Sequence, residues 1–134
     1  MIEFVDSLIT KYNLVKDSYY QESPYSEEAR RLTRDRPDDL EARIRTAKLQ
    51  EKYKANIPPK WYGFNGLGAP TPLVWFDALD EFFEKLISIH PNVEIYQVKV
   101  KFGSIRIYIS NTDAQVVEAV RKLADVLDDR KLIY

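Results

Sequence analysis

The residue types that most often carry catalysis are scarce in this chain. It contains no cysteine and one histidine, His90. These counts exclude a cysteine nucleophile, a thiolate zinc site, an iron–sulfur cluster and a histidine-rich metal site within one chain. His90 precedes Pro91 at the expected end of a helix, where an imidazole can cap backbone carbonyls and complement the helix dipole. This position favours a structural role for His90 over a catalytic one.

The remaining candidates for chemistry are three carboxylates, Asp77, Glu81 and Glu84, on one face of an expected helix. That pattern suits a hard metal ion or a general acid–base pair, but no second segment supplies groups that converge on it. A glycine-rich loop, residues 63–68, leads into the same helix and could cradle phosphate. It lacks the lysine of a P-loop, and Pro72 removes an amide donor. We therefore expect no catalytic residue, no cofactor and no metal, and a small-ligand or metal-dependent enzyme is the third hypothesis.

The composition is that of one soluble globular domain. Of the 134 residues, 45% are hydrophobic and 31% are charged, and the formal net charge is −1. This balance supplies no global field that would hold nucleic acid or an anionic membrane. The chain has no apolar run of membrane-spanning length, and its N-terminus carries acids where a signal peptide would carry a basic flank. We therefore expect a cytoplasmic protein.

The charges are unevenly distributed. Residues 30–54 contain nine basic and five acidic side chains, whereas residues 77–84 contain four acidic and no basic side chains. The two segments are either solvated faces that attract each other weakly, or one of them is a docking surface.

Apolar periodicity predicts the elements that position these residues. Thr71 is expected to cap the clearest helix, and a capping box from Thr112 to Gln115 opens the last one. The expected helices run from the N-terminus to about Ser23, from an N-cap at Ser26, over about 37–55, over about 72–89 and over about 112–128. The expected short strands lie over 60–64 and 131–134.

Alternating apolar residues predict a β-hairpin over residues 93–110. We place a two-residue turn at Gly103-Ser104, which puts every apolar side chain on one face and sets Lys101 opposite Arg106 on the other. Val93 and Ile95 fall out of phase, which predicts a bulge near Tyr96 and Gln97. The expected pairs are Phe102 with Ile105, Val100 with Ile107, and Val98 with Ile109.

The predicted fold class is α+β. A helical N-terminal extension (residues 1–56) precedes an α+β core (residues 57–134), in one compact unit. The element order of the core matches the split βαβ order of a ferredoxin-like two-layer sandwich, with a central β-hairpin and two amphipathic helices. A plainer arrangement of two helices over a hairpin is the alternative.

Two regions are candidate contact surfaces for a partner. The first is the hairpin face opposite the apolar one, with Lys99, Lys101, Arg106 and Tyr108. The second is an aromatic loop, Trp61, Tyr62 and Phe64, which offers apolar anchors on an adaptable backbone. The cations of the first region could instead serve only to keep an open sheet face soluble, or the N-terminal helices could cover it.

The hairpin resembles a group of small uncharacterised proteins of phages and bacteria. The run from Gln97 to Tyr108, QVKVKFGSIRIY, is similar to their pattern Q-V-K-x-K-F-G-x-[LI]-R-x-Y after an amphipathic helix. The resemblance covers residues 66–110 and implies a mobile-element or bacterial context. It implies no activity, and this chain lacks the cysteine pair that many of those proteins carry after the hairpin.

The leading hypothesis is a non-enzymatic protein-interaction module with a protein partner, such as a phage-encoded inhibitor or a bacterial immunity protein. The second is a nucleic-acid-binding accessory protein that uses the basic hairpin face. An RNA-recognition strand would carry two aromatics in a basic-Gly-aromatic-Gly-aromatic pattern, whereas the corresponding stretch here has Val100 and Ser104 at two of those positions. The sequence does not indicate the oligomeric state.

Overall fold

Within the described residues the sheet has three strands, and a helix joins the first strand to the second. The computed structural model describes residues 1–14, 39–67, 71–101, 104–110 and 112–128. β1 (Gly63–Gly66) pairs in parallel with β2 (Ile95–Lys101), and β2 pairs antiparallel with β3 (Ser104–Ile109). α5 (Leu73–Ile89) joins β1 to β2, and α6 (Ala114–Val126) follows β3. The predicted α+β class is confirmed.

The split βαβ order of a ferredoxin-like sandwich is wrong for these strands. A split unit keeps another strand between the two that the crossover helix joins, whereas β1 lies directly beside β2. The first strand also begins three residues later than expected, because the Trp61 N–H donates to the Pro58 carbonyl in a turn. The strand expected over 131–134 lies outside the described residues.

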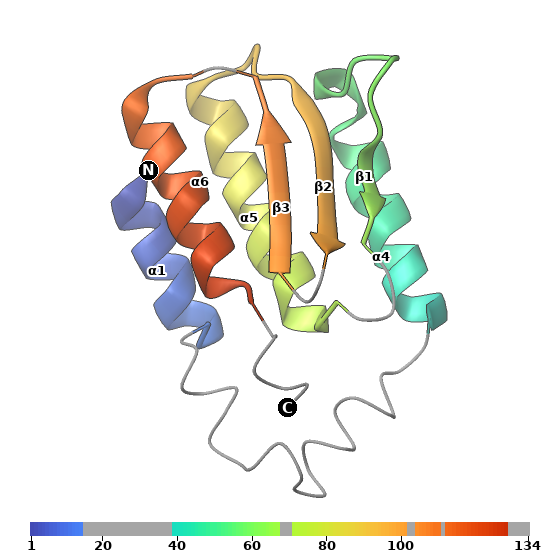
Figure 1. Ribbon diagram of the computed structural model, residues 1–134, viewed down its shortest axis with the longest axis horizontal. Coiled ribbons are helices and arrows are strands. Elements are labelled where there is room, and N and C mark those ends of the chain that lie inside the picture. Colours follow the sequence, from blue (N-terminus) through green and yellow to red (C-terminus); the bar gives the residue numbers. More distant parts are fainter. Residues whose placement is uncertain (15–38, 68–70, 102–103, 111, 129–134) are drawn as a thin grey trace, which may run out of the picture.

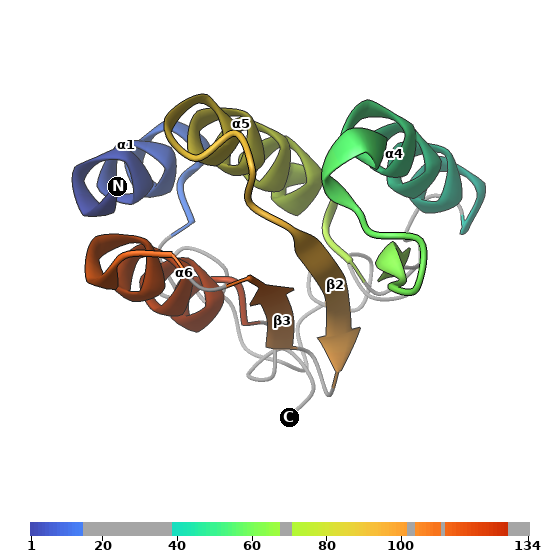
Figure 2. The same cartoon turned by 90° about the horizontal axis from the view of Figure 1, so that it is seen from above.

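The described helices leave one face of the sheet uncovered. Figure 2 shows α1 (Ile2–Tyr12), α5 and α4 (Asp39–Lys52) in a row on one side of the strands, with α6 beside the edge strand β3. In Figure 1 the three strands lie in front of α5 and α4. The hairpin is therefore amphipathic by position, with one face against the helices and the other toward solvent.

The core is centred on α5, whose periodic apolar residues predicted it well. The predicted span of about 72–89 is confirmed by a helix over Leu73–Ile89. Its buried side chains include Trp75, Phe82 and Phe83, all with no exposed surface. This element is the least polar of the described helices, as expected for one that packs between its neighbours and the sheet.

The two N-terminal helices share this core. Val5 of α1 and Leu49 of α4 are buried together with the side chains of α5. α1 ends at Tyr12, earlier than predicted, because Asn13 adopts a left-handed conformation (φ 54°) and the Leu14 N–H donates to the Ile9 carbonyl, a common helix-terminating geometry. The predicted continuation from residue 15 lies outside the described residues. After α4, a short 3-10 turn (Lys54–Asn56) leads toward β1.

The hairpin register differs from the prediction by two residues. Lys101 pairs with Ser104 instead of lying opposite Arg106, and the observed partner of Arg106 is Lys99. The expected turn at Gly103-Ser104 is thus wrong, because Ser104 already belongs to the ladder; residues 102 and 103 lie outside the described residues. A shift of two residues keeps every side chain on its face. Apolar residues therefore still lie opposite apolar residues, but with different partners. The observed apolar pairs are Val98 with Ile107 and Val100 with Ile105.

The predicted bulge is confirmed, but the predicted helix caps are not. The ladder changes register between Ile95 and Gln97, as the phase break indicated. Asp113 caps α6, with its carboxylate accepting from the Val116 N–H at 2.9 Å. Thr112, expected to be the cap, has a buried hydroxyl without a hydrogen-bond partner among the described residues, and so does Thr71 before α5.

No described helix combines the length and the apolar character that a membrane span needs.

Candidate functional site

The uncovered face of the hairpin carries adjacent cations. Lys99 and Arg106 are directly opposite each other in the ladder, and Tyr108 lies diagonally from Lys99, whose Nζ is 5.9 Å from the Tyr108 ring centroid. Arg106 and Lys101 are exposed, and Tyr108 is 47% exposed. We name these four residues the cationic sheet face. The structure thus brings together all four hairpin residues that the sequence predicted.

Aromatic side chains lie at the β1 end of the same sheet. The Trp61 ring packs against Tyr96, tilted by 39° with the centroids 4.6 Å apart, and the Tyr62 N–H donates to the Tyr96 carbonyl at 3.1 Å. Trp61 and Tyr62 are 48% and 58% exposed. Sequence reasoning missed Tyr96, which stands at the bulge; the phase break there was the signal that could have found it. We name Trp61, Tyr62 and Tyr96 the aromatic rim.

Phe64 does not belong to any contact surface. It has no exposed surface, and its ring packs edge-to-face on Phe83 of α5 with the centroids 5.2 Å apart. Tyr53 contacts both rings, with its centroid 5.9 Å from Phe64 and 6.0 Å from Phe83. The prediction failed for Phe64 because it lies within β1, where successive side chains alternate between the two faces, and its face is the one that meets the helices.

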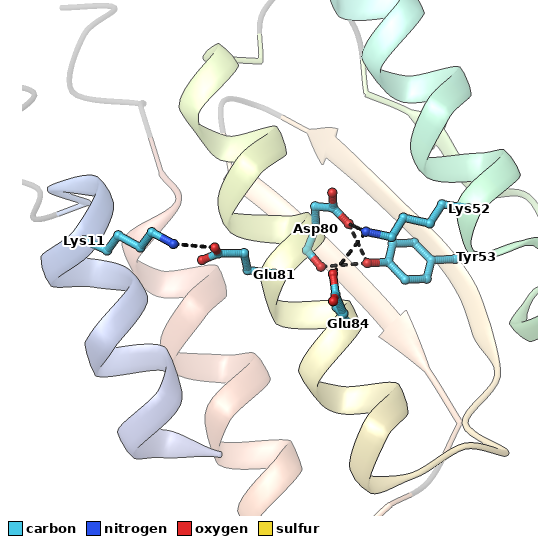
Figure 3. A network of polar contacts seen from close by, with 6 residues as sticks. All are labelled: Lys11, Lys52, Tyr53, Asp80, Glu81 and Glu84. Atoms are coloured by element: carbon cyan, nitrogen blue, oxygen red, sulfur yellow. Dashed lines mark hydrogen bonds and ion pairs between the residues drawn. The ribbon is translucent and has the colours of Figure 1, made fainter.

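The acidic face of α5 is neutralised by cations from both neighbouring helices. Figure 3 shows Lys11 of α1 paired with Glu81, and Lys52 of α4 between Asp80 and Glu84, at 2.8 and 3.1 Å. Arg45 of α4 likewise lies 3.3 Å from Asp77. The predicted attraction between the basic and acidic segments is therefore observed for residues 39–54; residues 30–38 lie outside the described residues.

Tyr53 anchors α4 to the same acidic face. Its hydroxyl lies 2.7 Å from the carbonyl oxygen and 2.5 Å from a carboxylate oxygen of Asp80 (Figure 3). Burial, followed by the hydrogen bond to Asp80, raises the pKa of Tyr53 far above that of an ordinary tyrosine. The hydrogen bond to Asp80 also raises the pKa of Lys52. Tyr53 and Lys52 therefore keep their protons to higher pH than an ordinary tyrosine or lysine does.

This network accounts for the acids that could have formed a metal or acid–base site. Within the described ranges, no three His, Asp or Glu side chains are placed to hold a metal ion. Grooves of about 610 Å³ and 340 Å³ flank α5 on its α1 and α4 sides, and the paired Lys11, Glu81, Arg45 and Asp77 line them.

His90 lies at the C-terminal end of α5, as predicted. Its backbone N–H donates to the Leu86 carbonyl, and its Nε2 is 3.2 Å from a carboxylate oxygen of Asp113. The pKa of Asp113 is lowered, first by the hydrogen bond from the Val116 N–H and further by the charge of His90. The pair therefore joins the end of α5 to the start of α6.

Comparison of the chain with protein-family models, curated proteins and solved structures found no match.

Proposed function

We propose that this chain is a non-enzymatic protein-interaction module that binds a protein partner through the cationic sheet face. The observation that carries the proposal is the juxtaposition of Lys99 and Arg106 with no acidic partner in the part of the chain that the structure describes. Like charges directly opposite in a ladder are unfavourable unless an anion neutralises them. No acidic side chain of the described residues pairs with either, whereas Lys11, Arg45 and Lys52 on the helical side all have acidic partners.

The aromatic rim supports a protein partner. Interface hot spots are enriched in tryptophan, tyrosine and arginine, and those three types are exposed on and beside this sheet face. The contact of Trp61 with Tyr96 restricts the indole before binding, which reduces the side-chain entropy lost when a partner covers it.

The biological role that fits is a phage-encoded inhibitor of a host system or a bacterial immunity protein. The support for this role is the resemblance of the run from Gln97 to Tyr108 to small phage and bacterial proteins. Because such proteins act by occupying a partner, the role needs no catalytic group.

A matched pair of double variants tests the proposal. The tagged chain is used to capture its partner from the native host, and the identified protein is then purified and titrated. Lys99→Glu with Arg106→Glu should weaken binding at least tenfold, about 1.4 kcal/mol. Lys54→Glu with Arg121→Glu makes the same change in charge at exposed sites away from the face and should bind like the wild type. Equal affinity of the two double variants would remove the cationic sheet face from the proposal.

Single-stranded nucleic acid is the second candidate, favoured by the half-exposed Tyr108 ring beside Lys99 and Arg106. Aromatic platforms among cations are the general means of binding single strands. Binding of this kind weakens steeply with salt, with a slope of about −0.7 for each phosphate neutralised. A fluorescent oligothymidylate titrated at several salt concentrations distinguishes the two candidates, because only the second predicts saturable, salt-sensitive binding.

A further inference from the structure

The backbone of β3 fixes how Lys99 and Arg106 face each other. The Ile105 N–H points away from β2 and donates to the Leu127 carbonyl at 3.0 Å. Because backbone groups alternate in direction along a strand, Arg106 directs its own N–H and carbonyl toward Lys99, its ladder partner. Opposite residues of this kind have Cα atoms about 5.5 Å apart and side chains on the same face. The two cationic side chains therefore extend side by side from adjacent strands.

Neighbouring side chains restrain this pair and add a donor. The Lys99 Nζ lies 5.9 Å from the centroid of the Tyr108 ring, diagonally across the ladder. Ser104 precedes Arg106 by two residues in β3, so its hydroxyl is on the same face. Arg106 thus has a lysine opposite it and a hydroxyl group next to it along the strand. The site offers two positive charges and several N–H and O–H donors within a small area.

The two charges indicate which anionic group of a partner fits the site. A single carboxylate neutralises only one of the two cations. Two carboxylates held about 5.5 Å apart would repel each other in the free partner, as Lys99 and Arg106 do here. A phosphate monoester carries a charge of about −1.5 to −2 near pH 7 and has three acceptor oxygens. Its charge matches both cations, and the planar guanidinium of Arg106 can bind two of its oxygens at once.

We infer that Lys99 and Arg106 form a recognition site for a phosphoserine or phosphothreonine of the protein partner. The inference rests on the proposed function, because it names the group through which that partner binds. Short phosphorylated side chains keep the backbone of the partner close to the sheet, so that flanking residues contact Tyr108 and the aromatic rim. Internal phosphates of a nucleic acid carry one charge each, spread along the strand, and match a pair of adjacent cations less well.

The test uses an acetylated, amidated five-residue peptide whose central residue is phosphoserine, glutamate or serine and whose neighbours are leucines. Binding to the full chain is followed by the NMR shifts of the Lys99 and Arg106 backbone amides. The phosphoserine peptide should bind at least tenfold more tightly than the glutamate peptide, and the serine peptide should not bind. Lys99→Gln and Arg106→Gln should each reduce this preference to about threefold or less, because one cation then remains. Lys54→Gln, an exposed change after α4, should keep the full preference.

Equal affinity for the phosphoserine and glutamate peptides would overturn the inference, and so would an unchanged preference in Lys99→Gln. The absence of any shift with the phosphoserine peptide at about 10 mM would also overturn it. Tighter binding of oligothymidylate than of the phosphoserine peptide, at the same amides, would assign the face to nucleic acid instead.

Phosphatase treatment of the captured partner separates this inference from the proposed function. The inference predicts that dephosphorylation weakens binding at least tenfold in the wild type and has little effect in Lys99→Glu with Arg106→Glu. A partner that needs Lys99 and Arg106 but binds equally well after dephosphorylation would refute only the phosphate site. A partner whose binding is independent of both cations would refute the cationic sheet face, whatever the phosphoserine peptide does.

Discussion

Lys99 of β2 lies directly opposite Arg106 of β3, on the sheet face that the described helices leave uncovered. The two cations repel each other in the free protein. A residue pair that costs stability and faces solvent is a candidate for function, because its unfavourable energy is relieved when an anionic partner binds.

Lys99→Glu should therefore stabilise the protein while it weakens partner binding. The new carboxylate would face Arg106 and convert a repulsive pair into an attractive one, with a gain of about 0.2–1 kcal/mol in the free energy of unfolding. Urea unfolding measures this gain. Lys99→Gln should give a smaller gain, and a loss of stability in Lys99→Glu would contradict the ladder register.

Phe64→Ala should destabilise the protein much more than Trp61→Ala, although the sequence placed both residues in one contact loop. Phe64 is fully buried against Phe83, so its truncation should cost about 3–5 kcal/mol. Trp61 is half exposed, so its truncation should cost about 1 kcal/mol in the free energy of unfolding, mainly from the lost contact with the Tyr96 ring. Thermal unfolding checks the order, and similar losses for the two variants would contradict the placement of Phe64.

Tyr53→Phe should loosen the attachment of α4 to α5. The variant removes the hydroxyl that donates to Asp80, at a cost of about 1–2 kcal/mol. Tyr62→Phe changes an exposed ring and serves as the matched control, with no loss expected.

The same residue predicts a pH dependence at the alkaline end. The pKa of Tyr53 is raised by burial and by Asp80 from 10.0 in the unfolded chain. Above pH 10 the unfolded state loses the phenolic proton while the folded state retains it, so the free energy of unfolding falls as the pH rises. Urea unfolding at pH 8 and pH 11 should show a larger loss in the wild type than in Tyr53→Phe, and equal losses would argue against a buried, proton-retaining Tyr53.

Asp113→Ala should lower the melting temperature by several degrees, because the carboxylate caps α6 through the Val116 N–H. Thr112→Ala is the control and should have little effect, since the Thr112 hydroxyl bonds to none of the residues that the structure describes. The pKa of Asp113 is lowered in the folded protein, so its carboxylate stabilises the fold at neutral pH. This stabilisation is lost as acid protonates the carboxylate below pH 3.8. A larger loss of stability in Thr112→Ala than in Asp113→Ala would mean that Thr112 caps α6, as the sequence predicted.

Local patterns predicted the elements whose formation depends on neighbouring residues in the chain. The apolar stripe from Trp75 to Leu86 was sufficient for α5, and the phase break after Ile95 was sufficient for the bulge. The face of the hairpin was also predictable, because alternation assigns Lys99, Arg106 and Tyr108 to one side whatever the exact register.

The hairpin register was not predictable from alternation alone, since after a shift of two residues apolar side chains still lie opposite apolar side chains, although each has a new partner. The alternation pattern therefore cannot distinguish Lys101 from Lys99 as the neighbour of Arg106. Phe64 was misplaced for a related reason: a four-residue strand has too few residues to show its alternation, and only its partner strand reveals which side faces the core.

The sequence by itself determined the α+β class, the helix α5 and an amphipathic hairpin with cations on one face. Tertiary structure alone decided that α4 neutralises the acids of α5, that Gln50 of α4 bonds to the edge of β1, and that Lys99 and Arg106 remain without an acidic partner among the described residues. The physical reason is that periodicity records the surroundings of each residue along its own element, whereas ion pairs and edge bonds join residues from elements that only the folded chain brings into contact.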